Sequence, residues 1–226
     1  MEPLIAEDLL LLLLDDEKGR VPASMWVDVG TPLAAAALAE LGMHEAVELE
    51  PGSFLSSARL RATGRSEADP TLARVLAVVA EKPRAVSSVV ERSKKGLRDD
   101  VAQRLVQAGV LRREEDRVLG LFPRTSWPAV DVQREAGVRE RLRQVLVGGA
   151  EPDPRTAVLA GVLGALERVP QTLGLHGAEA KEAKQRAKAI AKGDWASKAV
   201  TDAMQAVMMA TMVPVIVTTA ATGSGT

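Results

Sequence analysis

Four basic residues crowd the predicted start of a helix, where their natural ligand is a phosphate group. They are Arg92, Lys94, Lys95 and Arg98. Lys95 and Arg98 are three residues apart, so on a helix they share one face. Gly96 lies between them and lets the backbone approach a ligand closely, and the free N–H groups of a helix start attract anions. The equally weighted alternative is that Glu91 and the Asp99-Asp100 pair neutralise the cluster.

A second chemical feature is Trp26, which lies on a polar loop between two apolar stretches. Loops run over the surface, so an indole placed there needs a reason. It either covers the end of a helix pair or inserts into a membrane interface, where its apolar body and polar edge both find partners. Trp127, beside prolines, and Trp195, at the start of the last predicted helix, are expected to pack in the core.

Residues for catalysis or metal binding are not evident. The chain has no cysteine, which excludes disulfides, thiolate nucleophiles and cysteine metal sites. His44 and His176 lack metal-ligand spacing, and His44 follows a predicted helix end, where an imidazolium suits the dipole. The acidic run Asp15–Glu17 is interpreted as a solvated helix end. We therefore predict a protein that is not an enzyme, with no catalytic residue, metal or cofactor.

Composition bounds the fold and the partners. The 226 residues are 46% hydrophobic and only 2% aromatic, so the core is built from Leu, Val, Ala and Met, which favours helices over a β-sandwich. The 29 basic and 30 acidic residues give a net charge of −1, whereas a generic nucleic-acid binder is strongly basic. Arginine outnumbers lysine about two to one, which we interpret as the mark of a G/C-rich bacterial genome.

The elements that must position these residues are mostly helices. Six leucines, Leu9–Leu14, are far too few to cross a bilayer, which takes ~20 residues, so they belong to a helix buried nearly all round. We predict a mainly α fold, a helical bundle core ringed by amphipathic helices, with two short β-hairpins. The predicted helices are Leu4–Asp15, Leu33–Gly42 (capped by Thr31, with Pro32 first), Thr71–Glu81 (capped by Asp69), Val86–Arg92, Lys94–Ala108, Val132–Leu146, Arg155–Arg168, Ala178–Lys192 and Asp194–Met212. The predicted hairpins are Val47–Leu49 with Ala58–Ala62, and Val110–Phe122, which the loop Pro123–Asp131 follows.

The two ends of the chain bear on membrane attachment. The acidic N-terminus lacks the basic region of a secretory signal. Ala203–Ala221 carries no charge and approaches spanning length, but Gln205 and Pro214 interrupt it. We expect a buried terminal helix that ends near Pro214, with a membrane anchor as the alternative. The predicted organisation is one domain over residues 1–213 and a flexible C-terminal tail over residues 214–226.

Several segments together resemble the Golgi phosphoprotein three family, known in bacteria as the GPP34 domain, and the chain looks like a bacterial, more narrowly an actinobacterial, member. The segments, which occur in the family's order and spacing over nearly the whole chain, are EDLLLLLLDDEKG (residues 7–19), MWVDVG (residues 25–30), Ala46–Glu50, Gly64–Asp69, Leu72–Ala80, Leu97–Leu111 and Glu151–Leu166. The resemblance implies a mostly helical fold without enzyme activity. It also implies peripheral binding to phosphatidylinositol 4-phosphate at the cytosolic face of a membrane.

In the eukaryotic members of this family a Trp and three Arg form the headgroup pocket. Carried onto this chain, the Trp falls on Trp26, and the paired Arg fall on Lys95 and Arg98. Lysine keeps the charge but loses the bidentate geometry of arginine. The remaining Arg falls near Ala34, so that ligand is missing here, and the family's long basic N-terminal tail is absent. The predicted headgroup-binding set is Trp26, Lys94, Lys95 and Arg98.

The leading hypothesis is a cytoplasmic protein that docks on the inner face of a membrane, with Trp26 in the interface and Lys95 and Arg98 on a headgroup phosphate. The resemblance adds two partners, the tails of membrane enzymes and a second copy of the chain bound through the hairpin over residues 110–122. One rival is a protein-interaction adaptor with a vestigial lipid pocket. Another is a winged-helix-like DNA binder over Val86–Phe122, although Asp99 and Asp100 would repel phosphates at its recognition helix, so nucleic acid is not an expected partner.

Overall fold

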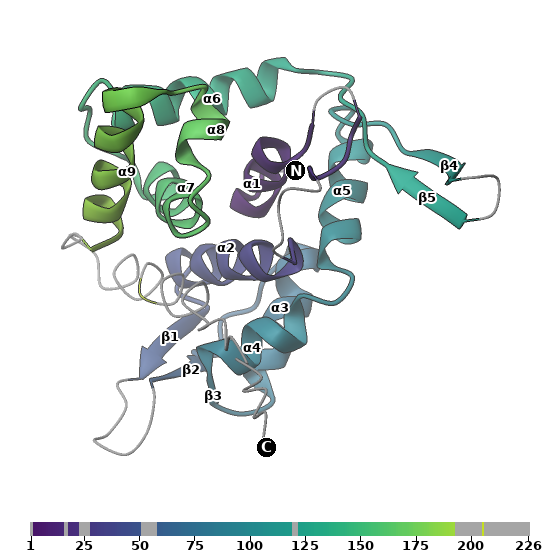
Figure 1. Cartoon of the computed structure of the whole chain (residues 1–226). Coiled ribbons are helices and arrows are strands. Elements are labelled where there is room, and N and C mark those ends of the chain that lie inside the picture. The colour runs from purple at the N-terminus through teal and green to yellow at the C-terminus, as the bar shows by residue number, and fades with distance from the viewer. Residues whose placement is uncertain are drawn as a thin grey trace, which may run out of the picture.

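The computed structural model in Figure 1 describes residues 2–15, 18–22, 28–50, 58–118, 122–192 and 205. These residues form nine helices and five strands, which confirms the mainly helical class. The helices are α1 (Ile5–Leu13), α2 (Gly30–Met43), α3 (Pro70–Ala80), α4 (Val86–Ser93), α5 (Leu97–Gln107), α6 (Gln133–Leu146), α7 (Pro154–Ala165), α8 (Val169–Leu173) and α9 (Gly177–Lys192). The strands are β1 (Val47–Glu50), β2 (Arg59–Ala62), β3 (Arg84–Ala85), β4 (Glu114–Val118) and β5 (Phe122–Ser126).

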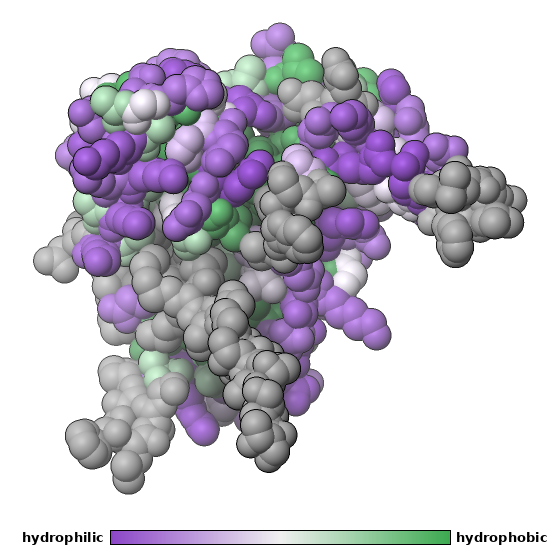
Figure 2. All heavy atoms as spheres, in the orientation of Figure 1, coloured by the Kyte–Doolittle hydropathy of each residue, from purple (hydrophilic) through white to green (hydrophobic). Residues whose placement is uncertain are grey.

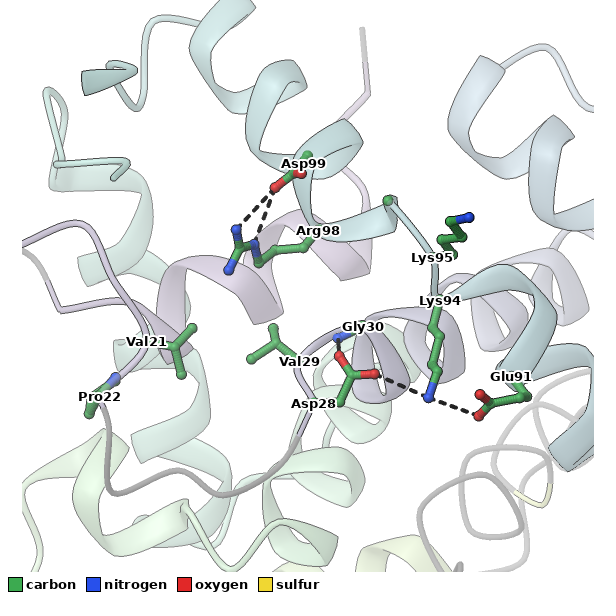
Figure 3. Close-up of a pocket in the computed structure, with 11 residues that line it drawn as sticks. Val21, Pro22, Asp28, Val29, Gly30, Glu91, Lys94, Lys95, Arg98 and Asp99 are labelled. Carbon is green, nitrogen blue, oxygen red and sulfur yellow. Dashed lines mark hydrogen bonds and ion pairs between the residues drawn. The ribbon is translucent and has the colours of Figure 1, made fainter. Parts of the chain in front are cut away.

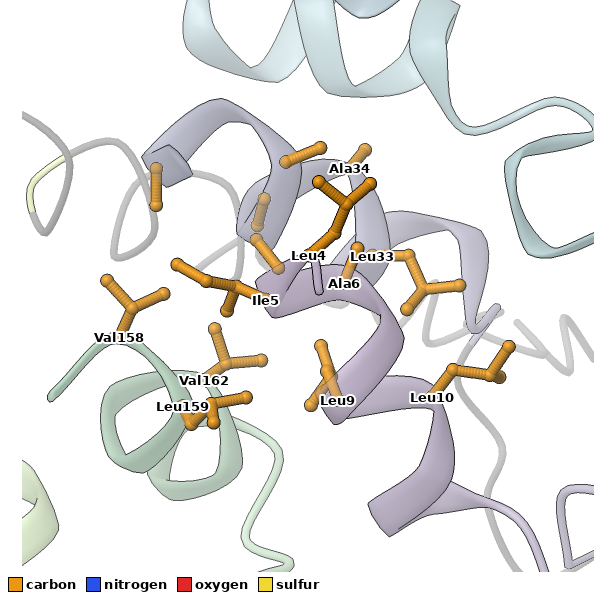
Figure 4. Packing of buried hydrophobic residues seen from close by; sticks show 14 of the residues in the cluster. Leu4, Ile5, Ala6, Leu9, Leu10, Leu33, Ala34, Val158, Leu159 and Val162 are labelled. Atoms are coloured by element: carbon orange, nitrogen blue, oxygen red, sulfur yellow. The ribbon is translucent and has the colours of Figure 1, made fainter. Parts of the chain in front are cut away.

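Helix α1 is the centre of the core, as the leucine run predicts. Every one of its residues is buried, and it packs against α2, α5, α6 and α7. Figure 4 shows Ile5 pointing toward Val158 and Val162 of α7, while Leu10 lies on the side of Leu33 of α2. Leucine has a high helix propensity, and each fully buried leucine contributes about 1.5–3 kcal/mol to folding. The surrounding helices therefore form one continuous apolar core around α1.

The first turn of α1 is buried together with two carboxylates, Glu7 and Asp8. Arg104 of α5 donates from Nε to Glu7 at 3.0 Å and also pairs with Asp69. Arg134 of α6 donates from Nη2 to Glu7 at 2.9 Å and to Asp8 at 2.8 Å. Carboxylates near a helix N-terminus are stabilised by the dipole, and buried ones need cationic partners.

A third arginine completes this network from α7. Arg155 pairs through Nη1 with buried Glu40 of α2 at 2.6 Å and donates from Nη2 to the Pro3 carbonyl at 2.7 Å. Glu40 also accepts the N–H of Ile5 at 2.9 Å. Burial raises the pKa of Glu40, and the opposing effects of Arg155 and of the Ile5 N–H do not cancel that rise. Arg104, Arg134 and Arg155 are here called the arginine clamp, because they tie α5, α6 and α7 to the start of α1 and to α2.

The predicted first hairpin is part of a three-stranded sheet. Antiparallel β1 and β2 pair Val47 with Ala62, and β3 extends the sheet on the free side of β2. Two residues are too short to give an alternating pattern, which is why the sequence does not reveal β3. The Asp69 cap of α3 is confirmed, since its side chain accepts the N–H groups of Thr71 and Leu72.

Two predicted helix starts need correction, and one helix was not predicted. Helix α2 begins at Gly30, whose N–H is accepted by Asp28 at 3.0 Å, so Asp28 and not Thr31 serves its first turn. The predicted helix Lys94–Ala108 begins only at Leu97, because Gly96 has a left-handed φ of 74°. Lys94 instead ends α4, and a further short helix, α8, was not predicted.

The second hairpin lies further along the chain than the predicted Val110–Phe122. Its strands β4 and β5 pair Glu114 with Ser126 and Val118 with Phe122, so β5 occupies part of the predicted loop Pro123–Asp131. The apolar residues that suggested its first strand are Val110 and Leu111, which are buried and precede β4. Figure 1 shows this hairpin projecting from the body as an arm.

The base of the arm is joined to the segment that follows α1. The buried Trp127 donates its backbone N–H to the carbonyl of Gly19 at 2.8 Å, and Arg113 lies over the Trp127 ring at 5.6 Å. A Cβ at Gly19 would lie 2.1 Å from the Pro128 nitrogen, and its φ is +56°. Only glycine tolerates both conditions. The expectation that Trp127 packs in the core is confirmed.

Helix α9 forms part of the surface. Among its described residues only Ala183 and Ala187 are buried, and Figure 2 shows hydrophilic side chains gathered over it. Each helix of the described part of the chain is too short or too polar to cross a bilayer. The predicted helix Asp194–Met212 with Trp195, the Ala203–Ala221 stretch and the tail over residues 214–226 lie outside the described residues.

Candidate functional site

A cavity of about 740 Å³ opens where α2 and α5 begin, beside the end of α4. We call it the cationic pocket, because three of the four predicted headgroup-binding residues line it. Its lining residues are Val21, Pro22, Asp28, Val29, Gly30, Glu91, Lys94, Lys95, Gly96, Arg98 and Asp99.

The pocket exists because two helix starts meet there. Gly30 at the start of α2 lies so close to the α4–α5 turn that an added Cβ would be 2.8 Å from the Lys94 carbonyl oxygen. Gly96 precedes α5 in the left-handed conformation, and a Cβ there would meet nothing within 4 Å. Among the described residues, the N–H groups of Gly96 and Arg98 have no acceptor. Such N–H groups at a helix start can bind a phosphate.

Lys94 lies between two carboxylates inside the pocket. Its Nζ is 2.8 Å from Glu91 and 3.2 Å from Asp28, and Figure 3 shows it bridging them. The hydrogen bonds that Lys94 donates to Glu91 and then to Asp28 raise the pKa of Lys94. Asp28 is therefore shared, since its other oxygen accepts the N–H of Gly30.

Arg98 and Lys95 are less constrained than Lys94. Arg98 donates from Nε and Nη2 to its neighbour Asp99, both at 3.2 Å, and its side chain is 45% exposed. Exposed pairs of this kind are worth about 0–1 kcal/mol, so a phosphate can compete for the guanidinium. Lys95 is exposed, and Figure 3 shows it extending away from Arg98. The two do not share a helix face as predicted, because Lys95 precedes α5.

Arg74 pairs with one of the acidic residues that were expected to neutralise the basic cluster. It pairs with Asp100 at 2.8 Å and donates to the Lys95 carbonyl at 3.0 Å. Asp100 does not line the pocket. The neutralising alternative thus holds in part, with Asp28, Glu91 and Asp99 facing the cations.

Trp26 lies within residues 23–27, outside the described residues, and its indole is not placed. Both flanks of that segment line the cationic pocket, Val21 and Pro22 before it and Asp28 and Val29 after it. Ala34 is fully buried in α2 and does not line the pocket, so no basic ligand comes from that position. Arg92 is exposed on α4 and also lies outside the lining.

Comparison with known proteins identifies the family of the chain. The family model described as Golgi phosphoprotein 3 (GPP34) matches residues 5–207. The chain belongs to this family. GPP34 proteins form a non-enzymatic family known for binding phosphatidylinositol 4-phosphate at Golgi membranes. No curated protein matches the chain significantly.

Two further features of this GPP34 protein bear on the sequence predictions. His44 ends α2, with its Nδ1 2.8 Å from Glu67, as expected for a histidine at a helix C-terminus. Among the described residues no group of His, Asp and Glu could hold a metal ion, and Asp16 and Glu17 lie outside them. The pocket residue that sequence reasoning missed is Asp28, although an aspartate just before a helix start is a recognisable cap signal.

Proposed function

We propose that this protein is a peripheral membrane protein that binds phosphatidylinositol 4-phosphate, or a related anionic phospholipid headgroup, in the cationic pocket. The observation that carries the proposal is the convergence of distant segments on one cavity. The pocket combines Lys94, Lys95 and Arg98 with both flanks of the segment that holds Trp26, about seventy positions earlier in the chain.

In this proposal the headgroup phosphate lies at the start of α5. It accepts hydrogen bonds from the N–H groups of Gly96 and Arg98, and the Arg98 guanidinium exchanges Asp99 for the phosphate. Lys95 reaches the same phosphate by rotating its exposed side chain. Lys94 stays paired with Glu91 and Asp28, so it contributes charge and shape more than a free donor. Trp26 inserts its indole into the membrane interface beside the pocket.

The cations and carboxylates that line the pocket are nearly balanced, and this bears on affinity. Each exposed basic residue near an anionic surface contributes about 1 kcal/mol, so Lys95 and Arg98 alone give weak binding. The indole and a second contact must supply the rest. In keeping with the resemblance, we propose the inner face of a bacterial membrane as the location, with the tails of membrane enzymes and a second copy of the chain as partners.

The test is sedimentation with phosphatidylcholine vesicles that do or do not contain phosphatidylinositol 4-phosphate. The double variant Lys95→Glu/Arg98→Glu should bind at least about 30-fold more weakly, the loss that two such residues account for. Trp26→Ala should also lower pelleting. The matched control is Lys181→Glu/Lys188→Glu, which reverses two exposed charges on α9, far along the chain from the pocket. Pelleting unchanged in both pocket variants would overturn the proposal.

The structure counts against the DNA-binding alternative at Arg104, a basic residue of the helix that would enter the DNA groove. Arg104, which would contact phosphates from the recognition helix, is 7% exposed and pairs with Glu7 and Asp69. Asp99 also lies beside Arg98, where it would oppose a nucleic-acid backbone. The adaptor hypothesis with a vestigial pocket stays a prediction, and vesicle binding that depends on Arg98 would count against it.

A further inference from the structure

A second cavity adjoins the cationic pocket and also contains arginines. It measures about 250 Å³ and lies at the end of α1, against α6 and α8. Asp15, Pro22, Arg139, Arg168 and Thr172 are among the residues that line it. Pro22 lines both cavities, so they adjoin at this residue.

Arg168 differs from the other arginines that have a buried nitrogen without an acceptor. Arg84 and Arg124 also leave Nε unpaired, but their Nη2 atoms pair with Glu81 and Asp116. The Arg168 Nε is buried, and no nitrogen of its guanidinium has an acceptor anywhere in the described part of the chain. A buried donor without an acceptor costs about 1–3 kcal/mol, so it requires an explanation. An acceptor supplied by a ligand is the simplest one.

The rest of the cavity is arranged to favour an anion beside Arg168. Arg139 is held in place by Glu135, at 2.7 Å from its Nε, and by the carbonyl of Thr172. The carboxylate that lines the cavity, Asp15, is partly occupied because it accepts the N–H of Lys18 at 2.7 Å. Glu135 pairs with Arg139, whereas Arg168 forms no ion pair with any described residue. Its planar fork matches a phosphate group, which offers several acceptor oxygens at once.

We propose that this cavity is a second phosphate-binding site, in which Arg168 binds the headgroup of an anionic phospholipid while the cationic pocket binds another. The inference rests on the proposed function, because the adjoining pocket is what brings the cavity to a lipid surface. A membrane presents many headgroup phosphates in one plane. Once the first is bound, the second binds at a high effective concentration, which strengthens binding without a large interface. It supplies the additional contact that the balanced charges of the cationic pocket require.

The experiment measures pelleting with vesicles whose fraction of phosphatidylglycerol in phosphatidylcholine is raised stepwise. With two sites, binding of the wild type rises with about the second power of the anionic fraction. In Arg168→Gln the exponent of this dependence falls toward about one. The affinity of that variant should drop roughly fivefold, the contribution of one basic residue. Arg168→Lys should be intermediate. Arg141→Gln, which removes an exposed charge from α6 outside both cavities, should behave as the wild type.

Four other outcomes distinguish the second site from the proposed function. If Arg168→Gln changes the unfolding midpoint but pellets as the wild type, Arg168 acts only on stability, and the second site is overturned. If glycerol 1-phosphate raises the midpoint of the wild type but not of Arg168→Gln while vesicle binding is equal, the ligand is a soluble phosphate and the lipid proposal fails. If Lys95→Glu/Arg98→Glu leaves pelleting unchanged, the proposed function itself fails. A loss there with none in Arg168→Gln removes the second site alone.

Discussion

Arg104 of the arginine clamp is 7% exposed and pairs with Glu7 and Asp69, whereas Arg98 of the cationic pocket is 45% exposed and pairs with its neighbour Asp99. Both arginines belong to α5, six positions apart. The partners of Arg104 come from residues 97 and 35 positions away, so the pair fixes the tertiary structure. Arg98 has no such distant partner among the described residues. The difference shows how burial and pairing assign one arginine to the tertiary structure and leave another accessible at the surface.

Among the substitutions that test this contrast, removal of Arg104 should lower the free energy of unfolding the most. Arg104→Met leaves Glu7 buried with an incomplete set of partners, and breaking a buried pair in this way costs about 3–5 kcal/mol. Arg98→Met should stay within about 0.5 kcal/mol of the wild type, as exposed substitutions do. Urea unfolding followed by circular dichroism measures both. Equal losses in the two variants would remove the distinction between clamp and pocket.

A glycine at the pocket tests how rigidly the turn before α5 is held. Gly30→Ala places a methyl group 2.8 Å from the Lys94 carbonyl oxygen, so the turn must shift, at a cost of about 1–3 kcal/mol. Vesicle binding should weaken along with stability. Gly137→Ala in α6 is the control, because its Cβ meets only the end of Arg141 at 3.8 Å. That variant should gain about 0.5–1 kcal/mol from helix propensity, and a loss there would discredit the comparison.

Salt separates the two regions without any mutation. Raising the salt from about 0.1 M to about 1 M shortens the Debye length from about 10 Å to about 3 Å. Exposed charges such as Lys95 and Arg98 are screened, so vesicle binding should fall more than about tenfold. The buried pairs of the clamp are screened much less, and the free energy of unfolding should change by less than about 1 kcal/mol. Binding that resists high salt would show that apolar insertion, and not the cations, carries the contact.

The smallest expected effect concerns the helix that delivers Arg155 to the clamp. Asp153 caps α7, and although burial raises its pKa, hydrogen bonds from Thr156 and from the Arg155 N–H together hold the pKa below its usual value. A lowered carboxyl pKa stabilises the fold above the unfolded pKa, and that stability is lost as pH falls through the folded pKa. Asp153→Asn should keep the cap and remove this acid sensitivity, whereas Asp153→Ala should cost about 1 kcal/mol at neutral pH. The measurement is the unfolding midpoint of each variant across acidic pH. If the midpoint of Asp153→Asn depends on pH as that of the wild type does, the Asp153 carboxyl is not the source of the acid sensitivity.

Sequence reasoning succeeded where local signals were strong. The leucine run located α1 and its complete burial, and Asp69 before Pro70 marked the start of α3. It failed where the deciding contact was distant or conformational. The partners of Arg104 cannot be inferred from its helix, and Gly96 reads as a flexible residue inside a helix until its left-handed φ of 74° separates α4 from α5.

The candidate site shows the same division. The cluster of Lys94, Lys95 and Arg98 is visible as a charge pattern, but its link to the segment after α1 came from the family resemblance alone. The structure supplies the physical reason, since Pro22 and Asp28 line the same pocket as those cations. Arg168 had no local signal, because an arginine between two helices is ordinary until its unpaired guanidinium is located in a cavity.

The close approach of Gly19 to Trp127 has a consequence for any attempt to redesign this surface. Pro22 lines both cavities. Three residues earlier, the carbonyl of Gly19 accepts the N–H of Trp127 at the base of the hairpin arm, and the backbone there leaves no room for a methyl group at Gly19. A library that randomises this loop to alter lipid preference should recover folded clones almost exclusively with glycine at position 19. Diversity is therefore best introduced at neighbouring positions whose side chains are not buried, such as Lys18 and Arg20.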